Sequence, residues 1–319
     1  MRGTPIIRRM SSGTPEAEAP ADRVEYREQP CRSALNRVTG MGFEWSLNPY
    51  MGCAHRCAFC YVRGFERRAD RPGDERYGQT IRVKTNVAEV LRAELARPSW
   101  KREFVLIGAA TDPYQPIEGR YRLTRGCLEA LADFRTPFSI ITRGTMAVRD
   151  LDVLQRASRR AAVSISFSVP TLDERVWRAT EPGTAHPRHR LRALGALVAG
   201  GVRASVALAP ILPGLSDSPE SLAAVVRAAR EAGACGIWSA PLNLREGTRE
   251  YFLSVLAREW PEELRRYELL FARRSYLPAN YGLEISARVK ALKLDAGIAD
   301  RRDVRLVPPE EASQMELPM

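Results

Sequence analysis

The sequence predicts an α/β fold in which parallel strands form a partial (β/α)6 barrel of the TIM type. Short apolar runs alternate with amphipathic helical segments six times between residues 43 and 240, and such runs are typical of strands covered on both faces. Six strand–helix units in a row favour a parallel sheet with right-handed crossovers. Because a closed barrel of this type has eight units, we expect an open side, with functional residues at the carboxyl ends of the strands.

The expected strands and helices alternate in order. A helix over 87–97 is predicted by Asn86 as its N-cap, by Glu89 as the partner in a capping box, and by apolar residues on one face. Asp150 is the expected cap of a later helix, and Pro187 is a typical first residue of another. The six expected strands are the runs at 43–47, 104–110, 138–143, 161–169, 202–208 and 235–240.

Three regions are expected along the chain. Residues 1–25 contain Pro, Ser, Gly, Ala and Glu and little that could pack, which predicts a flexible tail. Residues 26–245 are expected to form the barrel, with a charged, turn-rich surface excursion at 63–82. Residues 246–319 show helical periodicity and are expected to cover the barrel as a helical extension that ends in an acidic tail.

The composition and the lengths of the apolar runs indicate the cellular compartment in which we expect the protein. The chain has 319 residues, of which 45% are hydrophobic, so it can fill a sizeable core. No apolar run approaches the roughly 18 residues of a membrane span, and the N-terminal segment lacks the apolar core of a secretory signal. The 6 cysteines, half of them clustered, fit a reducing compartment. We therefore expect a cytoplasmic protein without a membrane partner.

The net charge of +11 allows two interpretations. Clustered basic residues neutralise phosphates, which favours a nucleic-acid partner. Most of the basic residues are arginines interleaved with acidic residues, however, and such a bias also arises from genome composition. Charge alone leaves nucleic-acid binding open.

Three cysteines within eight residues form the strongest local pattern in the chain. Cys53, Cys57 and Cys60 lie in the segment 48–63, at spacings of four and three. A short loop with these spacings can turn three sulfurs toward a common point, and thiolates are preferred ligands of zinc and of iron–sulfur clusters. The pattern predicts a metal site.

The identity of the metal is narrowed by what the rest of the sequence offers. A structural zinc site needs four ligands, whereas Cys31, Cys127 and Cys235 are isolated and His55 is expected to turn away from its neighbours. We interpret Cys127 as a core residue next to a helical apolar face. Three thiolates on a four-iron cluster would leave one iron open to a small molecule, and such an open iron implies chemistry.

The cysteine motif resembles that of a known family. Cys-x-x-x-Cys-x-aromatic-Cys, with Phe59 as the aromatic residue, resembles the signature of the radical S-adenosylmethionine (SAM) enzymes. The flanks Asn48-Pro49-Tyr50 and Tyr61 are similar to those of spore photoproduct lyase and the DNA repair photolyase-like proteins. Weaker similarity to this branch runs from about residue 26 to 242 and includes the segments 142–143, 181–184 and 209–211.

The resemblance implies a set of cofactors and contacts. Cys53, Cys57 and Cys60 would hold a [4Fe-4S] cluster whose open iron chelates SAM, and an electron from a donor such as flavodoxin or ferredoxin would generate a 5′-deoxyadenosyl radical. The contacts with SAM implied for this chain are Arg143 to the carboxylate, Ser164 and Ser166 to the ribose, the backbone of Phe59 near the adenine, and Ile211.

One departure from the family pattern bears on the substrate. Photoproduct lyases carry a hydrogen-donating cysteine at the end of the second strand, just before a Thr and an acidic residue, where this chain has Ala109, Ala110, Thr111 and Asp112. Repair of the spore photoproduct is therefore not expected, and another nucleic-acid lesion is the first candidate. The alternatives are a radical SAM modification of a different substrate, a zinc-stabilised nucleic-acid binding protein, and an electron carrier, which would normally supply a fourth cysteine.

Overall fold

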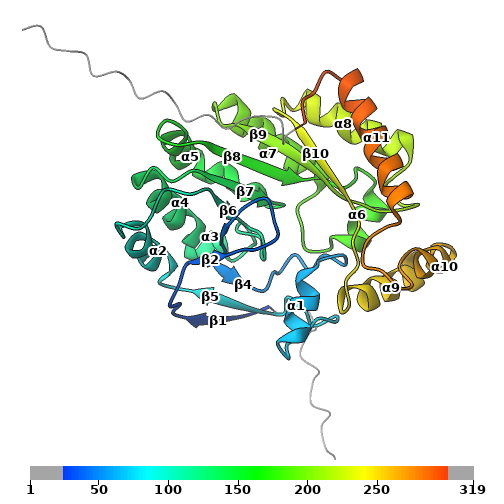
Figure 1. Cartoon of the computed structure of the whole chain (residues 1–319), viewed down its shortest axis with the longest axis horizontal. Coiled ribbons are helices and arrows are strands. Elements are labelled where there is room, and N and C mark those ends of the chain that lie inside the picture. Colours follow the sequence, from blue (N-terminus) through cyan, green and yellow to red (C-terminus); the bar gives the residue numbers. More distant parts are fainter. Residues whose placement is uncertain (1–23, 301–319) are drawn as a thin grey trace, which may run out of the picture.

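The computed structural model describes residues 24–300, which fold around a seven-stranded sheet (Figure 1). The strand order is β10-β9-β8-β7-β6-β3-β2. Neighbours from β3 to β10 pair in parallel, and β2 pairs antiparallel with β3 at one edge. The strands are β2 (Leu35–Arg37), β3 (Trp45–Leu47), β6 (Val105–Ile107), β7 (Phe138–Thr142), β8 (Val163–Ser168), β9 (Ala204–Ile211) and β10 (Ile237–Pro241).

The six predicted strands each overlap one parallel strand of this sheet, in the predicted order. The prediction of an α/β fold with a central parallel sheet is therefore confirmed. Its closure into a partial barrel stays a prediction.

Helices connect the parallel strands and follow the outer side of the sheet (Figure 1). α5 (Leu151–Ser158) and α7 (Pro187–Ala199) pack on β8, α7 and α8 (Pro219–Glu231) pack on β9, and α11 (Ala279–Asp295) packs on β10. Their apolar residues, such as Leu154, Leu194 and Val226, are buried in the main core, and this removal of apolar surface from water stabilises the layers. The helices that precede residue 245 are α1 (Val62–Arg68), α2 (Val87–Leu95), α3 (Glu118–Tyr121), α4 (Leu123–Asp133), the 3-10 helix η1 (Thr145–Asp150), α5 (Leu151–Ser158), α6 (Glu174–Thr180), α7 (Pro187–Ala199) and α8 (Pro219–Glu231).

Two predicted helix caps differ from the structure. Asn86 is the N-cap of α2, but its side chain pairs with the backbone of Cys31, at 2.7 and 3.1 Å, and makes no capping bond. The predicted capping box with Glu89 is therefore wrong. Asp150 precedes α5 without capping it, because its carboxylate binds the Arg149 guanidinium at 2.9 Å. Other partners compete for both side chains, Cys31 from a distant part of the chain for Asn86 and the adjacent Arg149 for Asp150.

A small second sheet, not predicted from the sequence, leads the chain into the cysteine loop. β1 (Glu25–Gln29) pairs in parallel with β5 (Thr80–Lys84), and β5 pairs antiparallel with β4 (Tyr50–Met51). The segment 63–82, expected as a surface excursion, thus contains α1 and the start of β5. Of the expected tail, residues 1–23 lie outside the described residues.

Between residues 246 and 300 the chain forms three helices. α9 (Thr248–Glu259) and α10 (Pro261–Leu270) pack together, and α11 (Ala279–Asp295) packs on α8 and β10. The expected acidic tail lies outside the described residues. No helix in residues 24–300 is both long enough and apolar enough to cross a membrane.

Among the described residues, the buried apolar side chains form two larger groups and a small third one around Cys53, Val62 and Tyr77. The main core lies between the sheet and the helices and includes Cys127, which confirms its interpretation as a packing residue. The second core joins the cysteine loop to α9 and α10 and includes Cys57, Phe59, Phe252 and Leu256. The C-terminal helices therefore pack directly on the loop that carries the cysteines.

Candidate active site

The three clustered cysteines line one cavity of about 400 Å³. The loop that carries Cys53, Cys57 and Cys60 runs from β4 to α1, and all three thiols are free. The other walls come from the carboxyl ends of the parallel strands, including Ala110 after β6 and Arg143 after β7. The sequence prediction that these strand ends meet the cysteine loop is therefore confirmed.

The three free thiols are ligands of the kind that iron–sulfur clusters take. In residues 24–300 no group of three or more His, Cys, Asp or Glu side chains is placed to hold one metal ion, as a zinc site requires. A four-iron cluster binds each thiolate at a different iron, so the sulfurs need not converge on one point. Burial raises the pKa of Cys57 to about 12, and burial also raises the pKa of Cys53. Thiolates at these buried positions need a nearby positive charge, which a bound metal would supply.

The first half of the cysteine loop is held by the segment that follows β6. Gln115 accepts a hydrogen bond from the Ala54 N–H at 2.9 Å and donates to the Gly52 carbonyl at 3.3 Å. The Thr111 hydroxyl donates to the same carbonyl at 2.6 Å. In the segment after α6, the Gly183 N–H donates a hydrogen bond to the His55 carbonyl. A Cβ at Gly183 would lie 2.3 Å from the Ala54 carbonyl oxygen. Only glycine allows this close approach.

The second half of the loop is held by the fully buried Arg63 of α1. Its Nε donates to the Cys57 carbonyl and one Nη to the Arg56 carbonyl, each at 3.0 Å. The other Nη donates to the carbonyls of Gly73 and Asp74, at 3.0 and 2.6 Å. One guanidinium therefore satisfies four backbone acceptors, two in the cysteine loop before α1 and two in the segment after α1, which offsets the cost of burying them.

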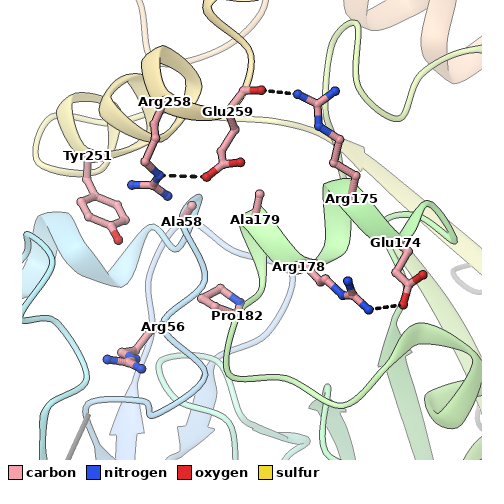
Figure 2. Close-up of a pocket in the computed structure, with 10 residues that line it drawn as sticks. All are labelled: Arg56, Ala58, Glu174, Arg175, Arg178, Ala179, Pro182, Tyr251, Arg258 and Glu259. Carbon is pink, nitrogen blue, oxygen red and sulfur yellow. Dashed lines mark hydrogen bonds and ion pairs between the residues drawn. The ribbon is translucent and has the colours of Figure 1, made fainter. Parts of the chain in front are cut away.

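Aromatic rings enclose this guanidinium. The Arg63 Cζ lies 4.6 Å from the centre of the Tyr77 ring and 3.7 Å from that of Tyr251 in α9. The Tyr77 hydroxyl is also 3.5 Å from the Cys60 sulfur. Tyr251 belongs at the same time to the wall of a second, open pocket on the other side of the cysteine loop (Figure 2).

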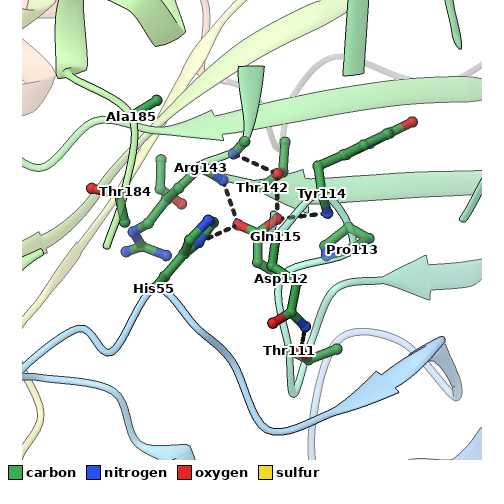
Figure 3. A network of polar contacts seen from close by, with 12 residues as sticks. His55, Thr111, Asp112, Pro113, Tyr114, Gln115, Thr142, Arg143, Thr184 and Ala185 are labelled. Carbon is green, nitrogen blue, oxygen red and sulfur yellow. Dashed lines mark hydrogen bonds and ion pairs between the residues drawn. The ribbon is translucent and has the colours of Figure 1, made fainter. Parts of the chain in front are cut away.

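A buried polar network joins the loop to the sheet, and Figure 3 shows its members converging on Asp112. Asp112 accepts hydrogen bonds from the Thr142 hydroxyl, from the Arg143 N–H and from the Tyr114 N–H, at 2.6, 2.6 and 2.9 Å. His55 Nδ1 lies 3.2 Å from Asp112 Oδ2. Burial alone would raise the pKa of Asp112, but the His55 charge and these donors outweigh burial and hold the pKa at about 2.

Arg143 enters the cavity with its guanidinium oriented by an acidic partner. Its Nε donates to Glu181 at 2.5 Å, and the guanidinium carbon lies 5.5 Å from the centre of the Phe59 ring. Glu181 is fully buried and also binds the fully buried Arg190, at 3.1 Å. The charges of Arg190 and Arg143 oppose the effect of burial and lower the pKa of Glu181. The terminal nitrogens of Arg143 have no hydrogen-bond partner among the described residues, so they can bind an anion.

The other residues expected to contact SAM differ in whether they line the cavity. Phe59 lines the cavity, whereas Ser164, Ser166 and Ile211 are buried and do not line it. The Ser164 hydroxyl donates to Ser139 at 2.9 Å, and the Ser166 and Ser205 hydroxyls lie 2.5 Å apart. A ribose contact of these two serines and a cofactor contact of Ile211 stay predictions.

Some site residues gave no signal in the sequence. Ser168, two positions beyond Ser166 on the same face of β8, lines the cavity. Arg63, Tyr77 and His55 also take up positions that sequence spacing alone did not predict, since their partners lie in other segments.

Comparison with known proteins defines the class. The family model described as the Radical SAM superfamily matches residues 47–227. The chain is 41% identical over 293 residues to an uncharacterized protein of Mycobacterium tuberculosis (strain H37Rv), covering 91% of this chain and 85% of the relative. The chain therefore belongs to the radical SAM superfamily, as the cysteine motif indicated.

Two further proteins place the chain within this class. The structure of spore photoproduct lyase complexed with dinucleoside spore photoproduct superimposes with a TM-score of 0.65 at 14% sequence identity, covering 90% of this chain and 85% of that one. The fold is thus that of spore photoproduct lyase. A radical SAM Nalpha-GlyT isomerase of Pseudomonas phage M6 is 28% identical over 168 residues, covering 52% of this chain and 33% of the isomerase.

The depressed pKa of Asp112 makes a prediction about acid stability. Its folded-state pKa of about 2 lies below the usual value of about 3.9, so its stabilising contribution is present above about pH 4 and is lost as the pH falls toward 2. We expect Asp112→Asn to lower the free energy of unfolding by about 2 kcal/mol near neutral pH. Denaturant unfolding at a series of pH values measures this difference.

The difference between the parent and Asp112→Asn should shrink between about pH 4 and about pH 2. Asp133→Asn, which removes a carboxylate whose side chain is 41% exposed, serves as the control and should change stability little. A difference for Asp112→Asn that is independent of pH would contradict the role of its charge.

Proposed function

We propose that this protein holds a [4Fe-4S] cluster on Cys53, Cys57 and Cys60 and cleaves SAM reductively to abstract a hydrogen atom from a substrate. The observation that carries the proposal is that three free thiols and the Arg143 guanidinium line one cavity at the carboxyl edge of a parallel sheet. When bound, the cluster and SAM would supply a 5′-deoxyadenosyl radical. The reducing cytoplasm predicted from the cysteine usage suits this chemistry.

Arg143 is the proposed partner of the SAM carboxylate. Glu181 orients its Nε and leaves the terminal nitrogens directed to the cavity, where a planar guanidinium can donate two parallel hydrogen bonds to a carboxylate. The Phe59 ring lies beside the same guanidinium and narrows its range of orientations. The buried ion pair between Glu181 and Arg190 holds the Glu181 carboxylate in place, because separating the two charges would leave each of them buried without this partner.

The remaining cavity walls are suited to protect a reactive intermediate. Leu106, Ala109, Ala110 and Ile141 line the cavity and give this part of its wall an apolar surface. Ala110 occupies the position at which a photoproduct lyase would offer a thiol, so this wall has no hydrogen donor there. We therefore propose that the substrate radical is resolved by a route other than thiol donation from this strand.

The mouth of the cavity supports a nucleic-acid substrate as the first candidate. Tyr276, Phe65 and Met41 line the cavity and are 58%, 40% and 55% exposed, and Arg245 donates to the Tyr276 hydroxyl at 3.0 Å. Exposed aromatic rings next to arginine are typical of surfaces on which unstacked bases lie. The net charge of +11 favours the same class.

Removal of one cluster ligand tests the proposed cluster. The parent protein, reconstituted without oxygen, should hold about four irons per chain and show the brown colour of thiolate-to-iron charge transfer. Cys57→Ala should lose both signals, whereas Cys127→Ala, which removes a thiol from the main core, should keep them. Iron and sulfide analysis measures this, and a Cys57→Ala variant that binds as much as the parent would show that the cysteine loop is not the cluster site.

Loss of the guanidinium tests the proposed SAM contact. A charge-assisted hydrogen bond contributes roughly 1.5 to 3 kcal/mol, so Arg143→Ala should weaken SAM binding by about 10- to 150-fold. Arg143→Lys should retain part of the affinity, because it keeps the charge but not the paired donors. Equilibrium binding of SAM to the reconstituted variants is the measurement. Unchanged affinity in Arg143→Ala would leave this residue a structural role only.

The salt dependence of binding tests the substrate class. If phosphate contacts drive association, affinity for duplex DNA should fall with a log–log slope of about −0.9 for each phosphate neutralised. Absence of binding to DNA and RNA at low salt would exclude this class and favour a protein side chain or a metabolite. The protein should not repair the spore photoproduct, and efficient repair would show that another thiol replaces the one missing at Ala110.

A further inference from the structure

An open pocket of about 550 Å³ lies beside the cysteine loop, outside the cavity described above (Figure 2). Its walls come from the cysteine loop, α6 and α9. We propose that this pocket is the docking surface for a small acidic protein that carries single electrons and reduces the cluster. This inference rests on the proposed function. The lining residues with formal charge are Arg56, Arg175, Arg178, Arg258, Glu174 and Glu259.

The charge of the pocket suits an acidic partner. Four arginines and two glutamates line it, so positive charge is in excess. The side chains of Arg178 and Arg258 are 70% and 64% exposed, and they pair with Glu174 and Glu259 at 2.7 and 2.8 Å. Exposed pairs of this kind are worth little, so both guanidinium groups can turn to the carboxylates of an incoming protein.

The pocket is structurally connected to the proposed cluster ligands. Ala58, between two of the cysteines, lines the pocket, and its N–H donates to the Thr180 carbonyl at the end of α6 at 2.8 Å. On the opposite wall Tyr251 packs on the Arg63 guanidinium, whose Nε donates to the Cys57 carbonyl. A carrier seated here would approach the loop closely, and electron tunnelling requires such short separation.

The pocket is separate from the path of the substrate. Arg56 lines both pockets, but Arg143, Ala110 and Asp112 line only the inner cavity. The exposed aromatic rim at Tyr276 also belongs to the inner cavity alone. A carrier could therefore dock while SAM and substrate occupy the inner cavity.

The proposed step is a single electron transfer. The reduced carrier is oxidised by one electron, which passes to the cluster, and no bond or proton moves between the two proteins. The chain's own contribution is to hold the carrier at a fixed place by long-range and contact charge interactions, which speed association more than they strengthen the final complex.

Charge reversal at the exposed arginines tests the surface. Arg178→Glu combined with Arg258→Glu should weaken binding of an acidic flavodoxin to the reconstituted protein by about tenfold at low salt. Arg97→Glu combined with Arg227→Glu makes the same change in net charge at exposed positions outside the pocket and should leave binding close to that of the parent. Calorimetric titration with oxidised flavodoxin measures both without relying on turnover.

Two further readouts separate the possible failures. With dithionite as the reductant, the pocket variant should cleave SAM as fast as the parent, and absence of cleavage in both would refute the proposed function without bearing on docking. Equal flavodoxin affinity in the pocket variant and the parent, or no binding to the parent, would overturn the docking proposal. A loss of duplex DNA affinity with unchanged flavodoxin affinity would also overturn it and assign the pocket to phosphate.

Discussion

The cysteine loop has only short turn hydrogen bonds of its own, such as those from the Arg56 N–H to the Cys53 carbonyl and from the Cys60 N–H to the Cys57 carbonyl, and the rest of the site depends on how other segments hold it. The buried Arg63 satisfies carbonyls at Arg56 and Cys57, while Gln115 pairs with the backbone at Gly52 and Ala54. These side chains come from the helix after the loop and from the segment after β6, so the loop is anchored on both sides. The three thiols, which we propose bind one cluster, are positioned by this anchoring, and preorganisation of this kind is what a cofactor site requires.

Buried charge organises the other half of the cavity. Glu181 lies between Arg190 and Arg143, and Asp112 lies between His55 and the backbone after β7. A buried carboxylate is costly alone, but each of these has cationic and hydrogen-bonding partners that keep it ionised. The consequence is that one arginine reaches the cavity in a defined orientation, with its unpaired donors available to an anion.

The sequence predicted what depends on local pattern. Apolar runs located the six parallel strands, and the cysteine motif located the segment that lines the cavity. The sequence pattern did not predict β5, because Ile81 and Val83 alternate with polar residues. This strand also belongs to the small second sheet and not to the main one. Nor could spacing reveal the partners of His55, since its contact with Asp112 forms only when the second parallel strand ends beside the loop.

The central claim is that this protein, with a cluster bound in its thiol-lined cavity, cleaves SAM reductively. Analysis of the reaction products tests this claim most directly. Protein reconstituted with iron and sulfide, reduced chemically without oxygen and incubated with SAM should release 5′-deoxyadenosine and methionine in equal amounts. Protein without the cluster should release neither. A fully iron-loaded, reduced protein that binds SAM yet leaves it intact in the presence of candidate substrates would contradict the account.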